Sequence, residues 1–176
     1  MRNTTELLAQ YAEYHRDRRN IATHLVGVPM IVFGVGVLLA RPAFMLAGIA
    51  LSPAWLLFAA TAAWYLTRGH LVVGAAVSAV VGVLLVFAHG VAYGSTATWL
   101  AWGVGAFVVG WVIQFIGHYY EGRKPAFVDD LAGLLVGPMF VTAEVLFALG
   151  LCQPLHAEIV QRAGPTLIRA RHHTHA

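Results

Sequence analysis

The sequence has few charged residues and a single cysteine. Lysine, arginine, aspartate and glutamate together make up 11% of its 176 residues, whereas hydrophobic residues make up 59%. Soluble domains carry roughly 25% charged residues, so this composition excludes an ordinary water-soluble domain and indicates an integral membrane protein. The lone Cys152 excludes an internal disulfide. No basic stripe interleaved with aromatic residues occurs, so we expect no binding to nucleic acid.

The N-terminus lacks the features of a secretory signal peptide. Residues 1–20 carry charges of both signs, and no apolar segment precedes His24. We therefore expect no cleavage, and the first apolar run should remain as a membrane segment. No repeat with a period of 20–50 residues is present, which excludes a solenoid or array.

Long apolar runs predict an all-α, polytopic membrane bundle. We expect four to five membrane segments and, before them, a short amphipathic helix within residues 1–22 that lies on the membrane surface or against the bundle. The expected membrane segments cover residues 24–40, 43–67, 71–92, 99–117 and 131–151. Together they form one membrane-embedded domain over residues 1–155, followed by a polar tail over residues 156–176.

Proline and glycine make two of these segments irregular. Ser52 followed by Pro53 is typical of a helix start, so the regular part of the second segment should begin there. Residues 43–51 are then either its kinked beginning or a half-buried connection. In the last segment, Gly137 and Pro138 are expected to kink or divide the helix.

The basic residues predict the orientation of the segments. If the segments cross alternately, the N-terminal residues, Arg68 and the loop at Arg123 lie on one side, which the positive-inside rule identifies as cytoplasmic. The basic C-terminal residues lie outside if the last segment spans, and inside if it is re-entrant, and the sequence leaves both open. In either case, His24 and His118 face the same compartment.

Two polar clusters stand where apolar runs meet that compartment. The first covers residues 14–20 and is followed by His24. The second covers residues 114–126, in which His118 and Glu121 are three residues apart and project from one helix face. Ionisable groups at or in a membrane span are costly, so each is a candidate for function. The residues that this topology brings together are His15, His24, His118, Glu121 and Glu144.

Histidines with one carboxylate suit a non-haem iron(II) site, because nitrogen and oxygen donors hold the ion while open positions accept dioxygen and a chelating substrate. No HExxH or other specific metal motif occurs. The spacing therefore leaves two interpretations open. Either the histidines bind a metal, or they cap and bridge helices by hydrogen bonds. The histidines near the C-terminus, His172, His173 and His175, are expected to belong to a disordered tail or to bind metal incidentally.

Three further ionisable residues also have alternative roles. Glu144 lies within the last apolar run, so we expect it to be protonated, paired or a metal ligand. Arg123 is either an anchor at the membrane surface or a cationic clamp for a carboxylate head group. His89 is the only ionisable residue of the third segment, and it either bonds to another helix as a neutral imidazole or joins a metal site.

The residues at the two edges resemble a small membrane family, the one that includes the yeast 2-hydroxy fatty acid dioxygenase of phytosphingosine breakdown. The similarity covers residues 11–40 and 111–151. Its most specific part is Gln-Phe-Ile-Gly-His at 114–118, followed by Glu-x-Arg-x-Pro-Ala at 121–126. The resemblance implies an iron(II)-dependent enzyme that uses dioxygen to shorten 2-hydroxy fatty acids by one carbon.

The resemblance also implies roles for individual residues. His15, His24 and His118 would be metal ligands or their immediate support, whereas Glu121, Arg123 and Glu144 would be catalytic. Which of Glu121, Glu144 and His89 adds a ligand to the metal stays open. The implied partners are a 2-hydroxy fatty acid, dioxygen and the lipid bilayer, and the oligomeric state is unknown. The composition favours a bacterial cytoplasmic membrane, with the site on the cytoplasmic side, or the endoplasmic reticulum membrane in a eukaryote.

Two other functions are compatible with the composition. His89, Glu144 and His118 would line a proton or ion path in a small transporter, or the chain would be a membrane adaptor without chemistry. A path needs polar groups through the whole depth of the membrane, whereas a metal site needs them at one place. Most ionisable residues here gather at one edge, which favours a site.

Overall fold

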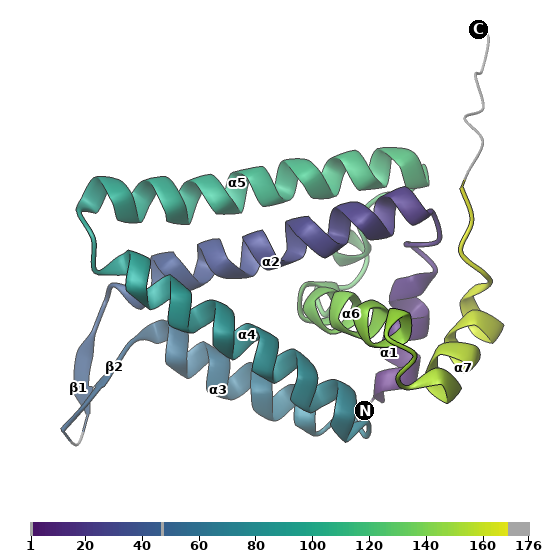
Figure 1. Cartoon of the computed structure of the whole chain (residues 1–176), viewed down its shortest axis with the longest axis horizontal. Helices are drawn as coiled ribbons and strands as arrows, with labels where there is room; N and C mark the ends of the chain where they lie inside the picture. The colour runs from purple at the N-terminus through teal and green to yellow at the C-terminus, as the bar shows by residue number, and fades with distance from the viewer. Residues whose placement is uncertain (1, 47, 169–176) are drawn as a thin grey trace, which may run out of the picture.

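The computed structural model describes residues 2–46 and 48–168. Over these residues the chain is a helical bundle with one short β-hairpin (Figure 1). The expected all-α class is therefore confirmed apart from the hairpin. In chain order the elements are α1 (Thr4–Ala12), α2 (Arg18–Ala40), β1 (Phe44–Leu46), β2 (Ile49–Leu51), α3 (Pro53–Leu66), α4 (Leu71–Ala92), α5 (Thr96–Glu121), the 3₁₀ helix η1 (Ala126–Val128), α6 (Gly133–Ala148) and α7 (Gln153–Ala163).

Within the described residues, three helices are long and apolar enough to cross a membrane: α2, α4 and α5. Helices α6 and α7 together would make a fourth span, bent by 117° at the break between them. Helix α3 is apolar but has only 14 residues. The expected segment at residues 71–92 coincides with α4, because a continuous apolar run and the turn before it define both ends.

Helix α2 begins six residues before the expected segment at residue 24. The side chain of Asp17 accepts a hydrogen bond from the backbone N–H of Arg19 and so caps a helix that starts with charged residues. The 23 residues of α2 extend about 34 Å, enough to cross a hydrocarbon core of about 30 Å. Helix α5 likewise extends past the expected residues 99–117 at both ends, and Gly122 terminates it in a left-handed conformation.

Helices α2 and α5 lie side by side and antiparallel (Figure 1). Glycines allow their backbones to touch. A β-carbon added at Gly27 would lie 2.9 Å from the carbonyl oxygen of Gly110, and one added at Gly34 would lie 2.8 Å from that of Gly103. Small residues at such contacts are typical of helix packing in membranes. This close contact sets the register of the two helices, and with it the position of the histidines they carry.

Residues 43–51 do not continue a helix. They form the antiparallel pair of β1 and β2, which pairs Phe44 with Leu51 at the end of the bundle far from the N-terminus (Figure 1). Helix α3 begins at Pro53 with Ser52 as its N-cap, as expected, although the Ser52 side chain makes no capping hydrogen bond. Apolar composition alone does not distinguish a short hairpin from a kinked helix, because the same apolar residue types occur in both.

The C-terminal part differs from expectation in two places. Of the two alternatives for Gly137 and Pro138, a kink or a division of the helix, the division is wrong, because α6 runs unbroken through both residues to Ala148. The chain turns instead at residues 149–152, and α7 begins with Pro154 in its first turn, where proline is favoured. The tail expected from residue 156 is therefore helical as far as Ala163, and the residues of the histidine-rich tail from 169 to 176 lie outside the described part.

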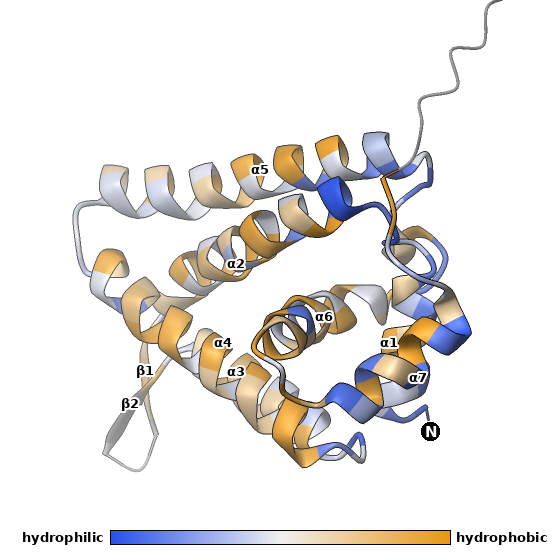
Figure 2. Ribbon diagram, turned by 45° about the vertical axis from the view of Figure 1, so that its right-hand side comes forward, coloured by the Kyte–Doolittle hydropathy of each residue, from blue (hydrophilic) through white to orange (hydrophobic). Residues whose placement is uncertain are grey.

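Helix α1 packs between α6 and α7 and is largely buried there. Asn3 is its N-cap, and Asn3 and Glu6 form a reciprocal capping box. The backbone N–H and hydroxyl of Thr4 both donate to the carbonyl of Arg68, which ties the N-terminus to the turn between α3 and α4. Figure 2 shows hydrophilic residues where α2 begins and along α1 and α7, next to otherwise hydrophobic helices.

Candidate metal centre

Three histidines from distant parts of the sequence meet at the end of the bundle where α2 begins and α5 ends. His15 comes from the turn between α1 and α2, His24 from α2 and His118 from α5. Their ring centroids lie 4.4 Å (His15–His24), 5.1 Å (His15–His118) and 5.0 Å (His24–His118) apart. One ring nitrogen of each lies within 4.8 Å of the others, and all three residues are buried. The expected convergence of His24 and His118 is confirmed.

Backbone carbonyls orient two of the three imidazoles. Nδ1 of His15 lies 2.7 Å from the carbonyl oxygen of Tyr11, and Nδ1 of His24 lies 2.9 Å from that of Asn20. A carbonyl can only accept, so each Nδ1 is the protonated nitrogen and each Nε2 of the neutral ring carries a lone pair. The Tyr11 ring also stacks on His15, with centroids 4.1 Å apart and planes 6° from parallel.

The two Nε2 atoms point at each other across 3.0 Å. Each ring donates its only N–H proton to a backbone carbonyl, so both Nε2 atoms carry a lone pair and neither can donate to the other. The two lone pairs repel each other unless a cation binds them. Two nitrogens bound at about 2.1 Å to one ion and at right angles to each other would be about 3.0 Å apart. The donor set of His15 and His24, with His118 beside them, therefore fits a divalent transition metal such as Fe(II).

Burial keeps the cluster in the form that binds metals. The pKa of His15 is well below its usual value, first because burial disfavours the charged ring and then because His24 and His118 lie beside it. A metal ligand must be a neutral imidazole, so this environment favours metal binding over protonation.

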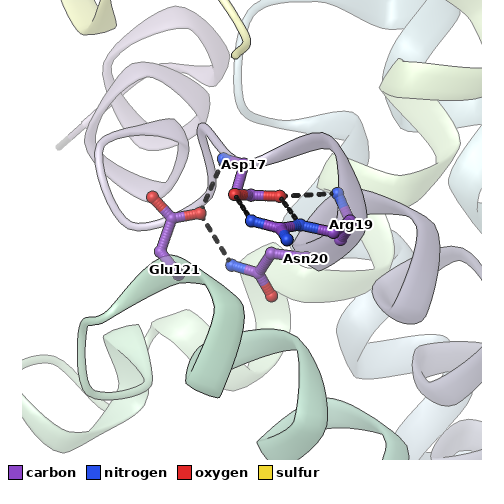
Figure 3. A network of polar contacts seen from close by, with 4 residues as sticks. All are labelled: Asp17, Arg19, Asn20 and Glu121. Carbon is purple, nitrogen blue, oxygen red and sulfur yellow. Dashed lines mark hydrogen bonds and ion pairs between the residues drawn. The ribbon is translucent and has the colours of Figure 1, made fainter. Parts of the chain in front are cut away.

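Glu121 on α5 holds the turn that carries His15. Its Oε2 accepts hydrogen bonds from the backbone N–H of Asp17 at 2.7 Å and from Nδ2 of Asn20 at 3.1 Å (Figure 3). Glu121 is 2% exposed, and Asp17 in turn forms an ion pair with Arg19 at 2.8 Å. The carboxylate thus stabilises the segment between His15 and His24 from the helix that carries His118. It is not among the three donors that lie within 4.8 Å of one another.

Arg16 is a buried cation that sequence reasoning did not single out. It is 5% exposed, its Nε donates to the carbonyl of Ala12 at 2.8 Å, and its Nη1 donates to that of Gly164 at 2.7 Å. Burial lowers the pKa of Arg16, while the negative charges of Glu144 and Glu121 oppose this shift. Glu144 therefore lies within electrostatic reach of Arg16, and the three alternatives for it, protonated, paired or a metal ligand, stay predictions. The dense polar run at residues 14–20 was the signal that could have identified Arg16.

The structure places Arg123 and His89 outside the histidine cluster. Arg123 is exposed, and its Nη1 donates to the carbonyl of Glu13 at 3.0 Å. His89 lies toward the hairpin end, where its Nε2 is 2.9 Å from the hydroxyl of Ser52 and its ring stacks on Trp55. The expectation that His89 is hydrogen-bonded to another helix is confirmed at the start of α3. Among the described residues, His89 therefore lies apart from the histidine cluster, with Ser52 and Trp55 as its neighbours.

A cavity of about 70 Å³ adjoins the cluster. Its lining includes His24 and His118, together with Tyr11, Gln114 and Pro138 of α6. A space of this size holds a few water-sized groups or the head of a small ligand. The histidine cluster is therefore accessible to a ligand from within the protein.

Comparison with known proteins gives two matches. A family model described as "Mpo1-like: 2-hydroxy-palmitic acid dioxygenase Mpo1-like" matches residues 1–149. A segment of 58 residues, 32% of this chain, is 41% identical to the 2-hydroxy-palmitic acid dioxygenase MPO1 of Saccharomyces cerevisiae. The matched segment spans only a third, 33%, of the length of that curated relative. No solved structure matches the chain.

Proposed function

The chain belongs to the Mpo1-like family of 2-hydroxy-palmitic acid dioxygenases, and from this we propose that it is a non-haem Fe(II) dioxygenase that shortens 2-hydroxy fatty acids by one carbon. The observation that carries the proposal is the contact between Nε2 of His15 and Nε2 of His24 beside His118, a buried donor set suited to a metal. Three helices are apolar enough to lie in a lipid bilayer, from which a fatty acid would reach the histidine cluster.

In this proposal His15, His24 and His118 hold the iron. A bound Fe(II) would supply coordination of dioxygen and of the hydroxyl and carboxylate oxygens of the substrate. The protein supplies the arrangement. The carbonyls of Tyr11 and Asn20 fix two imidazoles in the tautomer that a metal requires. Burial of the site excludes bulk water from the reacting carbon atoms.

We propose a different role for each of Glu121, Glu144 and Arg123. Glu121 positions the turn that carries His15 through its bonds to Asp17 and Asn20. Glu144 stabilises the buried Arg16, whose Nε also lies 3.1 Å from the carbonyl oxygen of His15. Arg123, exposed at the same end of the bundle, attracts the carboxylate of a fatty acid from the membrane surface. By the positive-inside rule this end faces the cytoplasm.

The overall equation is chemically complete. A 2-hydroxy fatty acid and one dioxygen yield the fatty acid shorter by one carbon, carbon dioxide and water, and the atoms and electrons balance without an added reductant. One dioxygen should therefore be consumed for each acid formed, which an oxygen electrode combined with mass spectrometry of the product can measure.

Metal content tests the proposal directly. In the full chain with His172, His173 and His175 replaced by alanine, we expect one iron per chain and conversion of 2-hydroxypalmitate to the C15 acid. His24→Ala and His118→Ala should each lose both iron and activity, because two imidazoles remain in a pocket built for three. Full activity in either variant would reject the ligand assignment. Activity without any bound metal would reject the proposed chemistry.

A further inference from the structure

A second and larger cavity, of about 410 Å³, lies among α2, α3, α4, α5 and α6. None of the described residues that line it is charged. The hydroxyls of Thr61 and Tyr65, which are on its wall, donate to the backbone carbonyls of Phe58 and Leu135 and so are satisfied within the protein. A cavity with such apolar walls favours an apolar ligand over water.

This apolar cavity adjoins the small cavity at the histidines. The two share a stretch of wall formed by α2, α5 and α6, whose residues are Ile31, Val32, Trp111, Leu134 and Pro138. An elongated ligand with its polar head beside His24 and His118 would therefore pass these residues to place its tail in the apolar space. Figure 1 shows α6 between α2 and the pair of α3 and α4.

The two cavities together match the length of a fatty acyl chain. The lining of the apolar cavity extends along α2 from Ile31 to Leu39, and Leu39 lies fifteen residues, or about 22 Å of helix, beyond His24 at the small cavity. A fully extended chain advances about 1.2 Å per bond, since a residue of three backbone bonds spans at most about 3.6 Å. A C16 chain is therefore about 18 Å long and fits between the histidines and the far end, where Ala54 and Leu85 also lie.

Two residues that line the cavity are also exposed at the apolar surface of the bundle. Leu57 on α3 and Leu134 on α6 line it and are 47% and 49% exposed. An acyl chain can thus move into the protein sideways from the bilayer without crossing water, where each exposed methylene is unfavourable.

We propose that this apolar cavity binds the acyl chain of the substrate and that Ala54, at its far end, limits the chain length. The inference rests on the proposed function for the identity of the polar head, but the cavity itself is tested without catalysis. Ala54 is 2% exposed and lines the cavity, so a larger side chain at this position would extend into it.

The experiment measures displacement of the fluorescent fatty acid parinaric acid from the full chain, without added metal, by 2-hydroxy acids of 10 to 20 carbons. Each buried methylene contributes roughly fourfold to affinity. Ala54→Phe should therefore weaken binding of C16 and C18 acids at least tenfold and leave the C10 acid unchanged. Leu85→Ala, which enlarges the same end, should shift the preference toward longer chains.

Ala59→Phe is the matched control, because Ala59 is exposed on the same helix and does not line the cavity. It should leave the chain-length profile unchanged. A wild-type protein that binds no parinaric acid, or identical profiles for all variants, would overturn the inference. A shifted profile in a protein that oxidises no 2-hydroxy acid would support the cavity and refute the proposed function, so the two failures are distinguishable.

Gln114 supports a second inference, on different grounds. Its side chain is 3% exposed and lines the small cavity with His24 and His118, one helical turn before His118. Neither its Oε1 nor its Nε2 has a hydrogen-bond partner among the described residues. Buried amides nearly always have partners, so a donor and an acceptor left together at a cavity wall point to a ligand that supplies both.

The geometry points to Gln114 as the residue that recognises the 2-hydroxy acid head group. A glutamine amide can donate from its NH₂ group to a carboxylate oxygen and accept from a hydroxyl through its carbonyl oxygen. An α-hydroxycarboxylate offers this pair, whereas an unsubstituted fatty acid lacks the hydroxyl. Gln114 would therefore discriminate between the two acids, a role that also rests on the proposed function.

The same displacement assay, with 2-hydroxypalmitate and palmitate as competitors, tests this role. Gln114→Leu keeps the approximate shape but removes both hydrogen-bonding groups, so the preference for the hydroxy acid should fall about fivefold to tenfold. Gln114→Asn should retain part of the preference. Gln161→Leu, at an exposed site on α7, is the control. An unchanged ratio of the two affinities in Gln114→Leu, with parinaric acid still bound, would overturn the assignment.

Discussion

Glu121 gives the sharpest test of how the histidine site is held together. Its Oε2 accepts two hydrogen bonds from groups that are separated from it by 104 and 101 positions in the sequence. Glu121→Ala would leave the backbone N–H of Asp17 and the side-chain amide of Asn20 without this acceptor in a buried place. A hydrogen bond to a charged group contributes about 1.5–3 kcal/mol, so the loss of both should cost about 3–6 kcal/mol.

The effect should extend to the metal. The freed turn carries His15, and removing a group that supports a metal ligand typically lowers metal affinity about 10–100-fold. We therefore expect Glu121→Ala to lower the thermal unfolding midpoint in detergent and to release iron to a chelator at a lower chelator concentration than the wild type. Glu121→Gln, which retains one acceptor oxygen, should show a smaller effect on both.

The control is Glu158→Ala. Glu158 forms an exposed ion pair with Arg162 on α7 at 2.6 Å, and such pairs contribute about 0–1 kcal/mol. If Glu121→Ala has the same unfolding midpoint as the wild type and releases iron at the same chelator concentration, Glu121 does not hold the turn. If it keeps both properties but loses activity, the carboxylate takes part in the reaction itself, and the positioning role is wrong.

Three further predictions concern other parts of the chain. Gly117→Ala places a methyl group against the start of α2 and should destabilise the protein by about 1–3 kcal/mol. A β-carbon added at Gly105 has no neighbouring atom within 4 Å, so Gly105→Ala should stabilise the protein by up to about 1 kcal/mol. Chemical denaturation in detergent measures both changes. His89→Phe removes a hydrogen bond at the hairpin end and should leave the iron content unchanged in elemental analysis. The pKa of Asp129 lies below its usual value because Lys124 and then Tyr14 bond to the carboxylate. The stability from these bonds should be present above about pH 4 and be lost as the pH falls through the lowered pKa, so the difference in unfolding midpoint between wild type and Asp129→Asn should vanish in acid.

The fold was predictable where local patterns decide it. The run of apolar residues that became α4 has the same bounds in sequence and structure, because hydropathy and a turn before it act over a few residues. The start of α2 was predicted too late, because the cap at Asp17 extends the helix through charged residues that hydropathy places outside it. The hairpin at residues 43–51 and the helix at residues 153–163 were missed for a related reason, since neither composition specifies one backbone conformation.

The sequence by itself determined that the chain forms long apolar helices, three of them able to cross a membrane, and that ionisable residues gather at one edge of the bundle. Only the tertiary structure decided which of those residues touch. It brought His15 onto His24, set Glu121 as the support of the turn between them, and left His89 at the opposite end with Ser52. The physical reason is that hydropathy and capping are local, whereas the histidine cluster depends on the close glycine contacts between α2 and α5, which no short stretch of sequence contains.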